Sequence, residues 1–510
     1  MKTRRTLYNS IASLTYYIIT ILLGIVNRKA VVSILGIEYQ GINGLFSNVL
    51  SMLSIAELGI GTAIIYHLYK PIHDKNTAEI QVLMRFYKKC YTAIACIIGG
   101  LGICIIPGLK FIVADNTLPY SLTELYIWFL LDAVVSYLFT YKRSILVADQ
   151  KNYIVVGCDL VYQCAVKLGQ VVILYMTHDF ILYLFVMVVT RIAENLYINY
   201  LSQKLYPFLI EKNAEKLSPQ LLKDIKQKVK GTIFHKIGSF VVLGTDNILI
   251  SKFLGLKAVG IYSNYFLIIN AIKNICTQLI SAATASVGQL LTEKNEAKAY
   301  NIFMEMQILN TGLINCAAIG IFWVTSPLIT VIFGKEFTLS NGTLFILSFN
   351  FYIQGIRNVF SIFKEAAGIL YEDRFIPVIE SVTNIVMSIL LLKYFGMAGI
   401  FMGTIISTLI IFFYTYPLLV YRNIFGKSLF EYYLEMLWLL IIPMISLFFS
   451  NEILKRFIYN NLYEQIIVNF IISVLISSLT FVCFYAIFHK ESVLLIRRLT
   501  NLIRKNTSIK

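Results

Sequence analysis

Long apolar stretches separated by short polar segments run along almost the whole chain. A helix needs about 20 mostly apolar residues to cross a bilayer. By that measure the sequence predicts fourteen spans, approximately 11–34, 40–66, 87–107, 120–140, 154–176, 180–201, 232–251, 258–290, 306–333, 341–363, 375–395, 397–420, 434–454 and 463–488. The pattern therefore predicts an all-α polytopic membrane protein with both termini on one side.

The composition agrees with a membrane protein. Of the 510 residues, 58% are hydrophobic and 14% are charged, against about 45–50% and about 25% in soluble domains. The N-terminal segment imitates a signal peptide but lacks a small-residue cleavage site, so we interpret it as a retained first span. The eight cysteines are scattered and form no CxxC pair. We therefore expect no disulfide framework, no metal site and no cofactor.

The basic residues predict the orientation of the spans. With both termini in the cytoplasm, 30 of the 44 Lys and Arg residues fall in cytoplasmic segments and 7 in external ones. This bias follows the positive-inside rule. Most of the net charge of +16 thus reflects topology and contact with anionic lipids, and we expect no nucleic-acid partner.

A stretch near the end of the first predicted span recurs later in the chain. Residues 27–46, NRKAVVSILGIEYQGINGLF, align with residues 246–265, DNILISKFLGLKAVGIYSNY, at a constant offset of 219. The identical pairs are Leu35/Leu254, Gly36/Gly255, Gly41/Gly260 and Ile42/Ile261. Both copies include the end of one span, a short external turn and the start of the next. The repeat indicates two lobes of six spans, an architecture common among transporters.

The predicted division of the chain follows from this repeat and from a long polar segment at residues 202–231. We expect an N-terminal lobe at 1–203, a cytoplasmic linker at 204–231, a C-terminal lobe at 232–422, and two last spans with a basic tail at 423–510. In the tail, apolar residues at helical spacing alternate with arginines. We expect this tail to lie along the inner leaflet of the membrane.

Several charged residues fall inside predicted spans. The cations are Arg28, Lys29, Lys167, Arg191, Lys236, Lys273 and Arg357, with His235 as a possible eighth, and the acids are Glu57, Asp132, Asp159, Glu194, Asp246 and Glu380. A charge at the bilayer centre costs about 2.5–3.5 kcal/mol on insertion scales, so these groups must be solvated, paired or neutralised. We expect most of them to line a polar cavity between the lobes.

Some of these charges have simpler explanations. Lys167, Arg191 and Lys273 could reach the membrane surface with their long side chains. Arg191 and Glu194 are three residues apart on one helix and could neutralise each other. Asp132 and Asp159 could pair with cations on neighbouring helices.

Arg28 is harder to explain in this way. It lies 22 residues after Thr6, about 33 Å along a helix, in the outer part of the first span. It could extend to the outer surface, but lining the cavity is the preferred interpretation. The planar guanidinium donates two parallel hydrogen bonds, which suits a phosphate group. Lys29 is only a possible second ligand.

Two further positions depend on their place in the seventh span. His235 and Lys236 open that span near the cytoplasm, where they could contact an entering substrate. Asp246 occupies the position of Asn27 in the second copy of the repeat, and a helix contact there is as plausible as a substrate role.

No enzymatic chemistry is evident. The sequence contains no GxxxxGK[ST], HExxH or GxSxG motif, and no soluble segment shows paired catalytic carboxylates. A membrane glycosyltransferase or polymerase would be expected to carry a sizeable external loop, whereas every predicted external loop is short. We therefore expect a transporter with no catalytic residues.

The sequence resembles the Wzx-type polysaccharide flippases of the multidrug/oligosaccharidyl-lipid/polysaccharide (MOP) exporter superfamily. The resemblance rests on HKIGSFVVLGTDNILISKFLGLKAVGIYSNYFLI, on residues 368–407, and on the first-span stretch with Gly36, Gly41, Gly59 and Gly61. It implies two six-helix lobes around a central cavity that opens alternately to each side, and two last spans that flank a lipid-accessible groove. Arg28 matches the first-span arginine shared with the related lipid II flippases.

The function implied by this resemblance is transport of an undecaprenyl-pyrophosphate-linked oligosaccharide to the outer leaflet of a bacterial cytoplasmic membrane. Membrane lipids would be partners, and a polysaccharide polymerase with its chain-length machinery could be. The alternatives are a cation-coupled multidrug exporter and a lipid II flippase. Proton or sodium exchange through acids such as Glu57, Asp132 or Asp159 could drive the cycle, as could use of the product outside.

Overall fold

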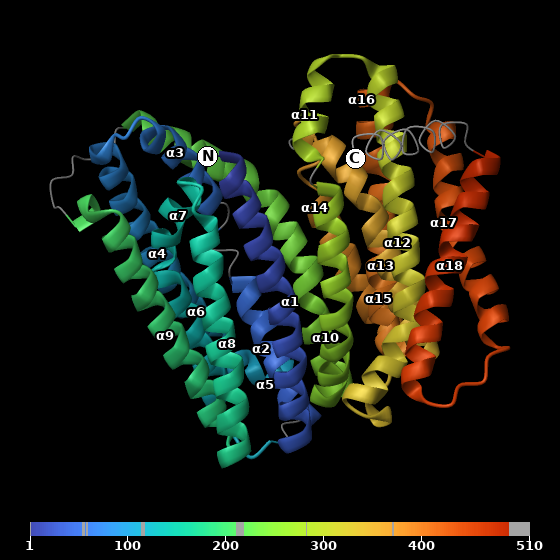
Figure 1. The fold of residues 1–510 in the computed structure, drawn as a ribbon, viewed down its shortest axis with the longest axis horizontal. Coiled ribbons are helices and arrows are strands. Elements are labelled where there is room, and N and C mark those ends of the chain that lie inside the picture. The colour runs from blue at the N-terminus through green and yellow to red at the C-terminus, as the bar shows by residue number, and fades with distance from the viewer. Residues whose placement is uncertain are drawn as a thin grey trace, which may run out of the picture. The chain divides into compact units, whose positions relative to one another are not determined.

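The computed structural model describes residues 2–53, 57, 60–113, 118–210, 219–281, 283–369 and 372–488, and within them the chain forms helices and no strands (Figure 1). The chain divides into two compact units, Met1–Ser263 (unit 1) and Asn264–Lys510 (unit 2). The all-α prediction is confirmed. The lobe boundaries expected at 204–231 stay a prediction, and residues 211–218 of that segment lie outside the described residues.

Unit 1 is a bundle of long helices joined by short turns. Its elements are α1 (Lys2–Ile34), α2 (Ile37–Leu53), α3 (Ile60–His73), α4 (Thr77–Ile105), η2 (Ile106–Gly108), α5 (Leu109–Ile112), α6 (Leu122–Leu138), α7 (Thr140–Ala148), α8 (Asn152–Thr177), α9 (Phe180–Leu205), η3 (Pro207–Ile210) and the first part of α10 (Pro219–Ser281). Helix α8 packs between α1 and α9, and α6 packs between α4 and α9. Several helices that carry the predicted charges are therefore neighbours.

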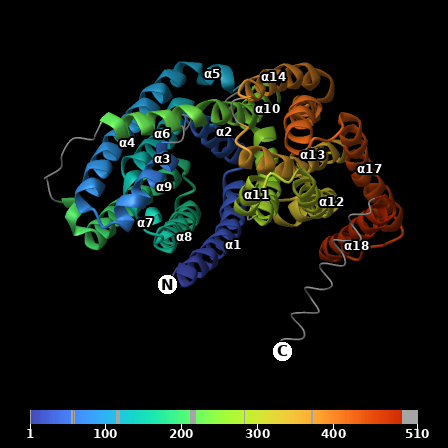
Figure 2. The same ribbon diagram turned by 90° about the horizontal axis from the view of Figure 1, so that it is seen from above.

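Unit 2 contains the rest of α10 and the helices that follow it. These are α11 (Thr284–Thr292), α12 (Glu296–Ile332), η4 (Lys335–Phe337), α13 (Asn341–Ala366), α14 (Ile376–Phe395), α15 (Met397–Ile410), the π-helix η5 (Ile411–Arg422), α16 (Asn423–Phe425), α17 (Leu429–Leu454) and α18 (Leu462–Phe488). Helix α12 packs against both α13 and α18, while α14 packs on α15. The last two helices lie side by side at the edge of unit 2 (Figure 2).

Within the described residues helices overlap each of the fourteen predicted spans, although residues 40–66 are divided between α2 and α3, and residues 54–56, 58 and 59 lie outside the described residues. By length and composition alone, ten helices of the described residues could cross a membrane, and the α6–α7 pair, bent by 42°, makes an eleventh. Three features explain why this count gives eleven spans and not fourteen. Helix α2 has 17 residues, α13 carries Arg357 and several amide side chains, and α10 joins two predicted spans across a break at Gly255. The chain is a multi-pass membrane protein.

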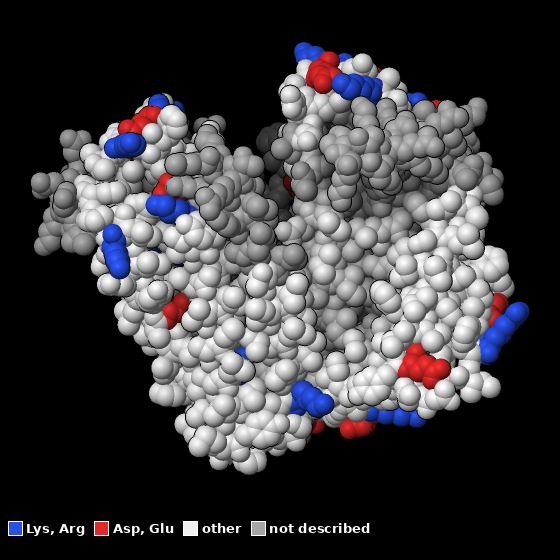
Figure 3. Space-filling view, in the orientation of Figure 1, with Lys and Arg blue, Asp and Glu red and all other residues white. Residues whose placement is uncertain are grey.

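The surface of unit 2 has the charge pattern of a membrane-embedded bundle. On the face shown in Figure 3, its described charged side chains gather toward the two ends, and the described residues visible between them are uncharged. Exposed apolar side chains such as Phe448, Ile471 and Leu475 contribute to this surface. Such a band is stable against lipid, because the polar backbone groups are satisfied within each helix.

The two copies of the sequence repeat share one backbone feature. Gly36 separates α1 from α2 at φ +111°, and Gly255 breaks α10 at φ +83°. Side chains other than glycine rarely tolerate such positive φ values. A turn therefore exists at the predicted place in each copy, and each turn requires its glycine; that the turns are external stays a prediction.

Candidate functional site

The two copies of the repeat pack directly against each other inside unit 1. A methyl group added to Gly41 would collide with the carbonyl oxygen of Leu256, and one added to Gly260 would collide with the carbonyl oxygen of Ile37. Gly260 is the equivalent of Gly41, and Leu256 is the equivalent of Ile37, at the offset of 219. Each glycine therefore contacts the same position of the other copy, and the contact is reciprocal. Such a contact has the geometry of a local two-fold axis between the copies. Glycine is required at both positions because the backbones touch.

Two side-chain hydrogen bonds follow the same symmetry. Arg28 donates from its guanidinium to the carbonyl oxygen of Ser263, and Asn247 donates from its amide to the carbonyl oxygen of Gly44, 3.4 Å away. Asn247 is the equivalent of Arg28, and Ser263 is the equivalent of Gly44. The structure shows that position 28 has an architectural contact that a neutral amide also makes.

A polar cluster fixes the helix that carries Arg28. The amide of Asn27 donates to Gln170 at 3.2 Å, and the hydroxyl of Tyr183 donates to Asn27 at 2.8 Å. Gln170 in turn donates to the backbone carbonyl of Tyr183 at 3.3 Å. These contacts hold α1 against α8 and α9. The position of Arg28 is therefore set by buried hydrogen bonds on the preceding residue.

Arg28 and Lys167 are neighbouring cations without a carboxylate partner. Arg28, Asp132 and Arg191 are the charges that act on Lys167, and neither Arg28 nor Lys167 forms an ion pair within the part of the chain that the structure describes. Lys29, next to Arg28, is exposed. Asp132 attracts Lys167 without forming an ion pair with it, while Arg28 and Lys167 repel each other, and a bound anion would relieve that repulsion.

A second group of charges in unit 1 is fully paired. Arg191 contacts Asp132 at 3.2 Å and Glu194 at 2.9 Å. Arg143 contacts Glu194 at 2.7 Å and also pairs with Asp159. The predicted pairing of Arg191 with Glu194, and of both aspartates with cations on neighbouring helices, is confirmed. We call these five residues the unit 1 ion-pair network.

Sequence reasoning missed Arg143. It was assigned to a cytoplasmic segment because it follows the predicted span 120–140. In the structure the chain bends by 42° between α6 and α7, so Arg143 reaches carboxylates on α8 and α9. The signal that could have found it is its place only three residues after the predicted span 120–140, close enough for its side chain to reach carboxylates on neighbouring helices.

Unit 2 has a smaller pairing of the same kind. Arg357 donates to Glu380 at 2.8 Å and to Gln354 at 3.1 Å. Lys273 lies within electrostatic reach of Arg357 and forms no ion pair with the described residues. Unit 2 thus repeats the contrast seen in unit 1, with one cation bound to a carboxylate and one without.

The remaining predicted residues are placed separately. Glu57 accepts a hydrogen bond from the hydroxyl of Tyr91 at 2.9 Å. Asp246 is 9% exposed, and its Oδ1 has no hydrogen-bond partner among the described residues. His235 and Lys236 lie in a stretch of α10 whose side chains are outside the described residues. The described residues contain no cluster suited to a metal ion.

A slot in unit 2 runs between α12 and α17. Its outer part, of about 660 Å³, has an aromatic and apolar floor that includes Phe322 and Trp323, with amide side chains such as Asn451 and Gln465 around it. A neighbouring, almost wholly apolar pocket of about 20 Å³ shares Phe322, Met444 and Leu447 with it. The slot therefore combines an apolar wall with amide side chains.

Comparison with known proteins identifies the class of this fold. No protein-family model matches the chain, and no curated protein matches it in sequence. Solved structures do match: the fold is that of the MOP-superfamily membrane transporters. Identity with them is between 12% and 16%, so the likeness is one of fold.

Three of these structures are informative. A lipid II flippase, MurJ, in an inward closed conformation superposes with a TM-score of 0.64 and 16% identity, covering 95% of this chain and 99% of its own. An inward-facing multidrug resistance MATE transporter gives 0.58 and 14%, covering 78% and 94%. A Pyrococcus furiosus MOP-superfamily transporter, described by the reverse polarity of its binding pocket, gives 0.52 and 12%, covering 80% and 92%.

Proposed function

We propose that this protein flips an undecaprenyl-pyrophosphate-linked oligosaccharide from the cytoplasmic to the outer leaflet of a bacterial membrane by alternating access. The observation that carries this proposal is the set of membrane-embedded cations that form no ion pair with the described residues. These cations are Arg28, Lys29, Lys167 and Lys273.

The charge balance supports an anionic substrate. Asp132, Asp159, Glu194 and Glu380 all pair with arginines. Once those pairs are made, the remaining charge is mainly positive. A pyrophosphate can bind arginine through two parallel hydrogen bonds, whereas a cationic drug would be repelled.

The slot in unit 2 supports a lipid-linked substrate. A polyprenyl chain is apolar and can pack against the apolar side chains of the larger part of the slot, of about 660 Å³, where Phe322, Leu447 and Phe448 lie. The extent of the structural likeness points the same way, because the lipid II flippase covers 95% of this chain and the MATE transporter 78%. Lipid II remains the second candidate substrate, since it has the same pyrophosphate and prenyl chemistry.

The physical task explains this combination of features. A charged diphosphate with a hydrophilic glycan cannot cross about 30 Å of hydrocarbon unaided. The prenyl chain can stay in lipid while the head passes through a wet, basic passage. Transport also requires comparable affinity on both sides, because tight binding in one state alone would trap the substrate.

Disruption of the gene, with analysis of lipid-linked saccharides on each leaflet, tests the proposal. Intact spheroplasts are treated with a membrane-impermeant glycan-oxidising reagent, and the lipids are then extracted. We expect one prenyl-linked glycan to accumulate and to stay protected from the reagent. Unchanged lipid-linked glycans together with new drug sensitivity would contradict the proposal and indicate a multidrug exporter.

A further inference from the structure

A proline interrupts the backbone hydrogen bonding of η5 in unit 2. Pro417 lies inside this π-helix and has no amide hydrogen, so one carbonyl of the preceding turn loses its backbone donor. In a π-helix, where the amide of residue i bonds to the carbonyl of residue i−5, that carbonyl belongs to Phe412. In an α-helix, where it bonds to the carbonyl of residue i−4, the carbonyl belongs to Phe413. An unsatisfied carbonyl is costly in a membrane-embedded helix.

Two consecutive tyrosines of α17 donate to these two carbonyls. The hydroxyl of Tyr432 donates to the carbonyl of Phe412 at 2.7 Å. The hydroxyl of Tyr433 donates to the carbonyl of Phe413 at 2.9 Å. A fixed π-helix needs only the first of these bonds, because the amide of Leu418 matches the carbonyl of Phe413 in the π pattern. The second bond is the one that an α-helical pattern requires.

A buried threonine in the same segment also favours the α-helical pattern. In α15 the hydroxyl of Thr404 donates to the carbonyl of Ile400, and the hydroxyl of Thr408 makes the equivalent bond one turn later. Such bonds to the residue four positions earlier are common for threonine in an α-helix. The hydroxyl of Thr415 is buried and has no hydrogen-bond partner among the described residues. An α-helical pattern in η5 would bring it to the carbonyl of Ile411.

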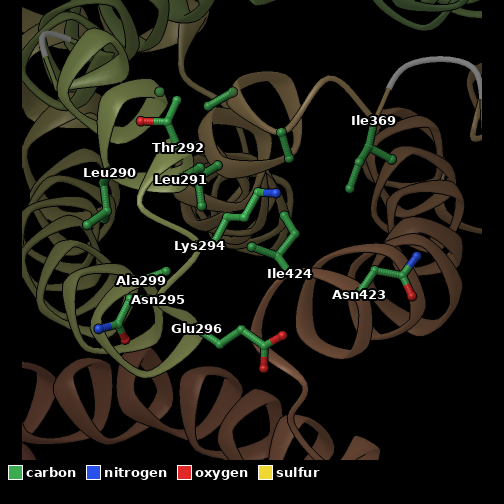
Figure 4. Close-up of a pocket in the computed structure, with 13 residues that line it drawn as sticks. Leu290, Leu291, Thr292, Lys294, Asn295, Glu296, Ala299, Ile369, Asn423 and Ile424 are labelled. Atoms are coloured by element: carbon green, nitrogen blue, oxygen red, sulfur yellow. The ribbon is translucent and has the colours of Figure 1, made fainter.

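The two ends of η5 differ in the space around them. On one side, a methyl group added to Gly399 of α15 would collide with the carbonyl oxygen of Leu391, so α15 cannot slide along α14. On the other side, η5 continues into α16, whose Asn423 and Ile424 line a cavity of about 550 Å³ beside the ends of α11 and α13 and the start of α12 (Figure 4). A change in the length of η5 can therefore be accommodated at the cavity.

The residue before Pro417 contacts the paired cation of unit 2. Tyr416 accepts a hydrogen bond from the guanidinium of Arg357, which also donates to Glu380 at 2.8 Å. The ring of Tyr416 stacks on Phe360 with 4.6 Å between the ring centroids. A shift of one residue in the hydrogen-bond pattern turns a side chain by about 100° around the helix axis. Such a shift would separate Tyr416 from Arg357.

We propose that η5 changes between the π-helical and α-helical hydrogen-bond patterns during the conformational cycle of unit 2. Tyr432 supplies the donor that is missing in the π pattern, and Tyr433 supplies the donor that is missing in the α pattern. The change satisfies Thr415, uses the space of the cavity and releases Tyr416 from Arg357. Helix α17 thereby controls the surroundings of the unit 2 cation. The proposal concerns how unit 2 changes conformation and does not depend on the transported substrate.

A distance measurement within unit 2 tests this change. Nitroxide labels on p-acetylphenylalanine replace Tyr394 and Tyr414, which are 82% and 54% exposed. Residues 397–414 separate the labels by about 25 Å of helix, and double electron–electron resonance measures the distance in lipid nanodiscs. Tyr432→Phe removes the donor that the π pattern needs, so most of the population should move to a second distance. Tyr433→Phe removes the donor of the α pattern and should leave only the distance of the present structure.

A restored amide separates a change of pattern from damage to α17. Pro417→Ala provides a backbone donor in both patterns, so adding Tyr432→Phe to this background should not change the distances. Tyr463→Phe, at an exposed tyrosine of α18, is the matched control and should keep the distances of the unsubstituted protein. Unchanged distances in folded Tyr432→Phe protein, or the same shift in Tyr433→Phe protein, would overturn the proposal and leave both tyrosines as fixed caps of a proline break. Because the measurement needs no substrate, its result is independent of the proposed function.

Discussion

Unit 1 holds two groups of membrane-embedded cations that differ in how their charge is compensated. Arg143 and Arg191 share Glu194, and each also contacts an aspartate. Arg28 and Lys167 have no carboxylate partner among the described residues, although Arg28 donates to a backbone carbonyl. In the first group two arginines contact three carboxylates, and these contacts hold helices together. The second group leaves positive charge available, so the difference separates a structural role from a binding role.

The two groups should respond differently to loss of charge. Removing one member of a buried ion pair leaves an uncompensated charge, which is strongly destabilising. Removing an unpaired cation takes away a charge that the fold does not need. Stability and transport should therefore separate in the two groups.

The largest expected effect on stability is at the carboxylate that both arginines share. Glu194→Ala removes one charged contact from Arg143 and one from Arg191, each of which keeps its aspartate, and should lower the free energy of unfolding by about 3 kcal/mol. Thermal unfolding of the purified protein measures this. Glu293→Ala, which removes an exposed pair with Lys298, should cost under about 1 kcal/mol and serves as the control. Equal melting temperatures for the two variants would show that the network is not structural.

The next largest effect on stability is expected at the reciprocal contact of Gly41 and Gly260. Gly41→Ala and Gly260→Ala each place a methyl group against a backbone carbonyl, and each should cost about 1–3 kcal/mol of unfolding free energy. The two costs should be similar, because the contacts are equivalent. Gly157→Ala on α8, which meets open space, should be neutral or slightly stabilising. A large cost at only one of the two glycines would argue against the local two-fold symmetry.

A substitution at Lys167 tests whether the unpaired cations serve transport and not stability. Lys167→Gln should change the unfolding free energy by less than about 1 kcal/mol, since no ion pair is lost. Transport of the lipid-linked glycan should fall roughly tenfold if the side chain contributes one charged hydrogen bond to the phosphate. The assay is reconstituted flipping, measured beside thermal stability. A variant that unfolds easily but transports normally would assign Lys167 to the structural group.

The smallest effect is expected at the neutral counterpart of Arg28. Asn247→Ala removes one hydrogen bond to the carbonyl of Gly44 and should cost about 1 kcal/mol of unfolding free energy. Glycan transport should stay close to normal. If transport were lost in folded Asn247→Ala protein, the hydrogen bond itself would be the functional element, and the charge at Arg28 would lose its special role.

Much of the fold follows from local sequence patterns. Apolar runs predicted the helices, the offset of 219 located two equivalent turns, and Gly36 and Gly255 have the positive φ values that those turns require. The i,i+3 spacing also predicted the pair of Arg191 and Glu194. These features can be predicted because they depend on residues that are close in sequence and on the periodicity of a helix.

The candidate site could be predicted only in part, because its contacts join distant segments. The bend before Thr140 carries Arg143 into the network, and nothing in the local sequence specifies the direction of that bend. Similarly, the hydrogen bond from Arg28 to Ser263 joins positions far apart in the chain. The repeat revealed that the two turns are equivalent, but not that they face each other.

The charge of Arg28 is the central claim, and Arg28→Gln tests it most directly. Glutamine keeps a donor for the carbonyl of Ser263, as Asn247 does for Gly44, but it has no charge for a pyrophosphate. We predict normal membrane abundance and melting temperature with loss of glycan flipping, and partial flipping in Arg28→Lys. Normal flipping by the Arg28→Gln protein would contradict the account and leave Arg28 with the architectural role alone.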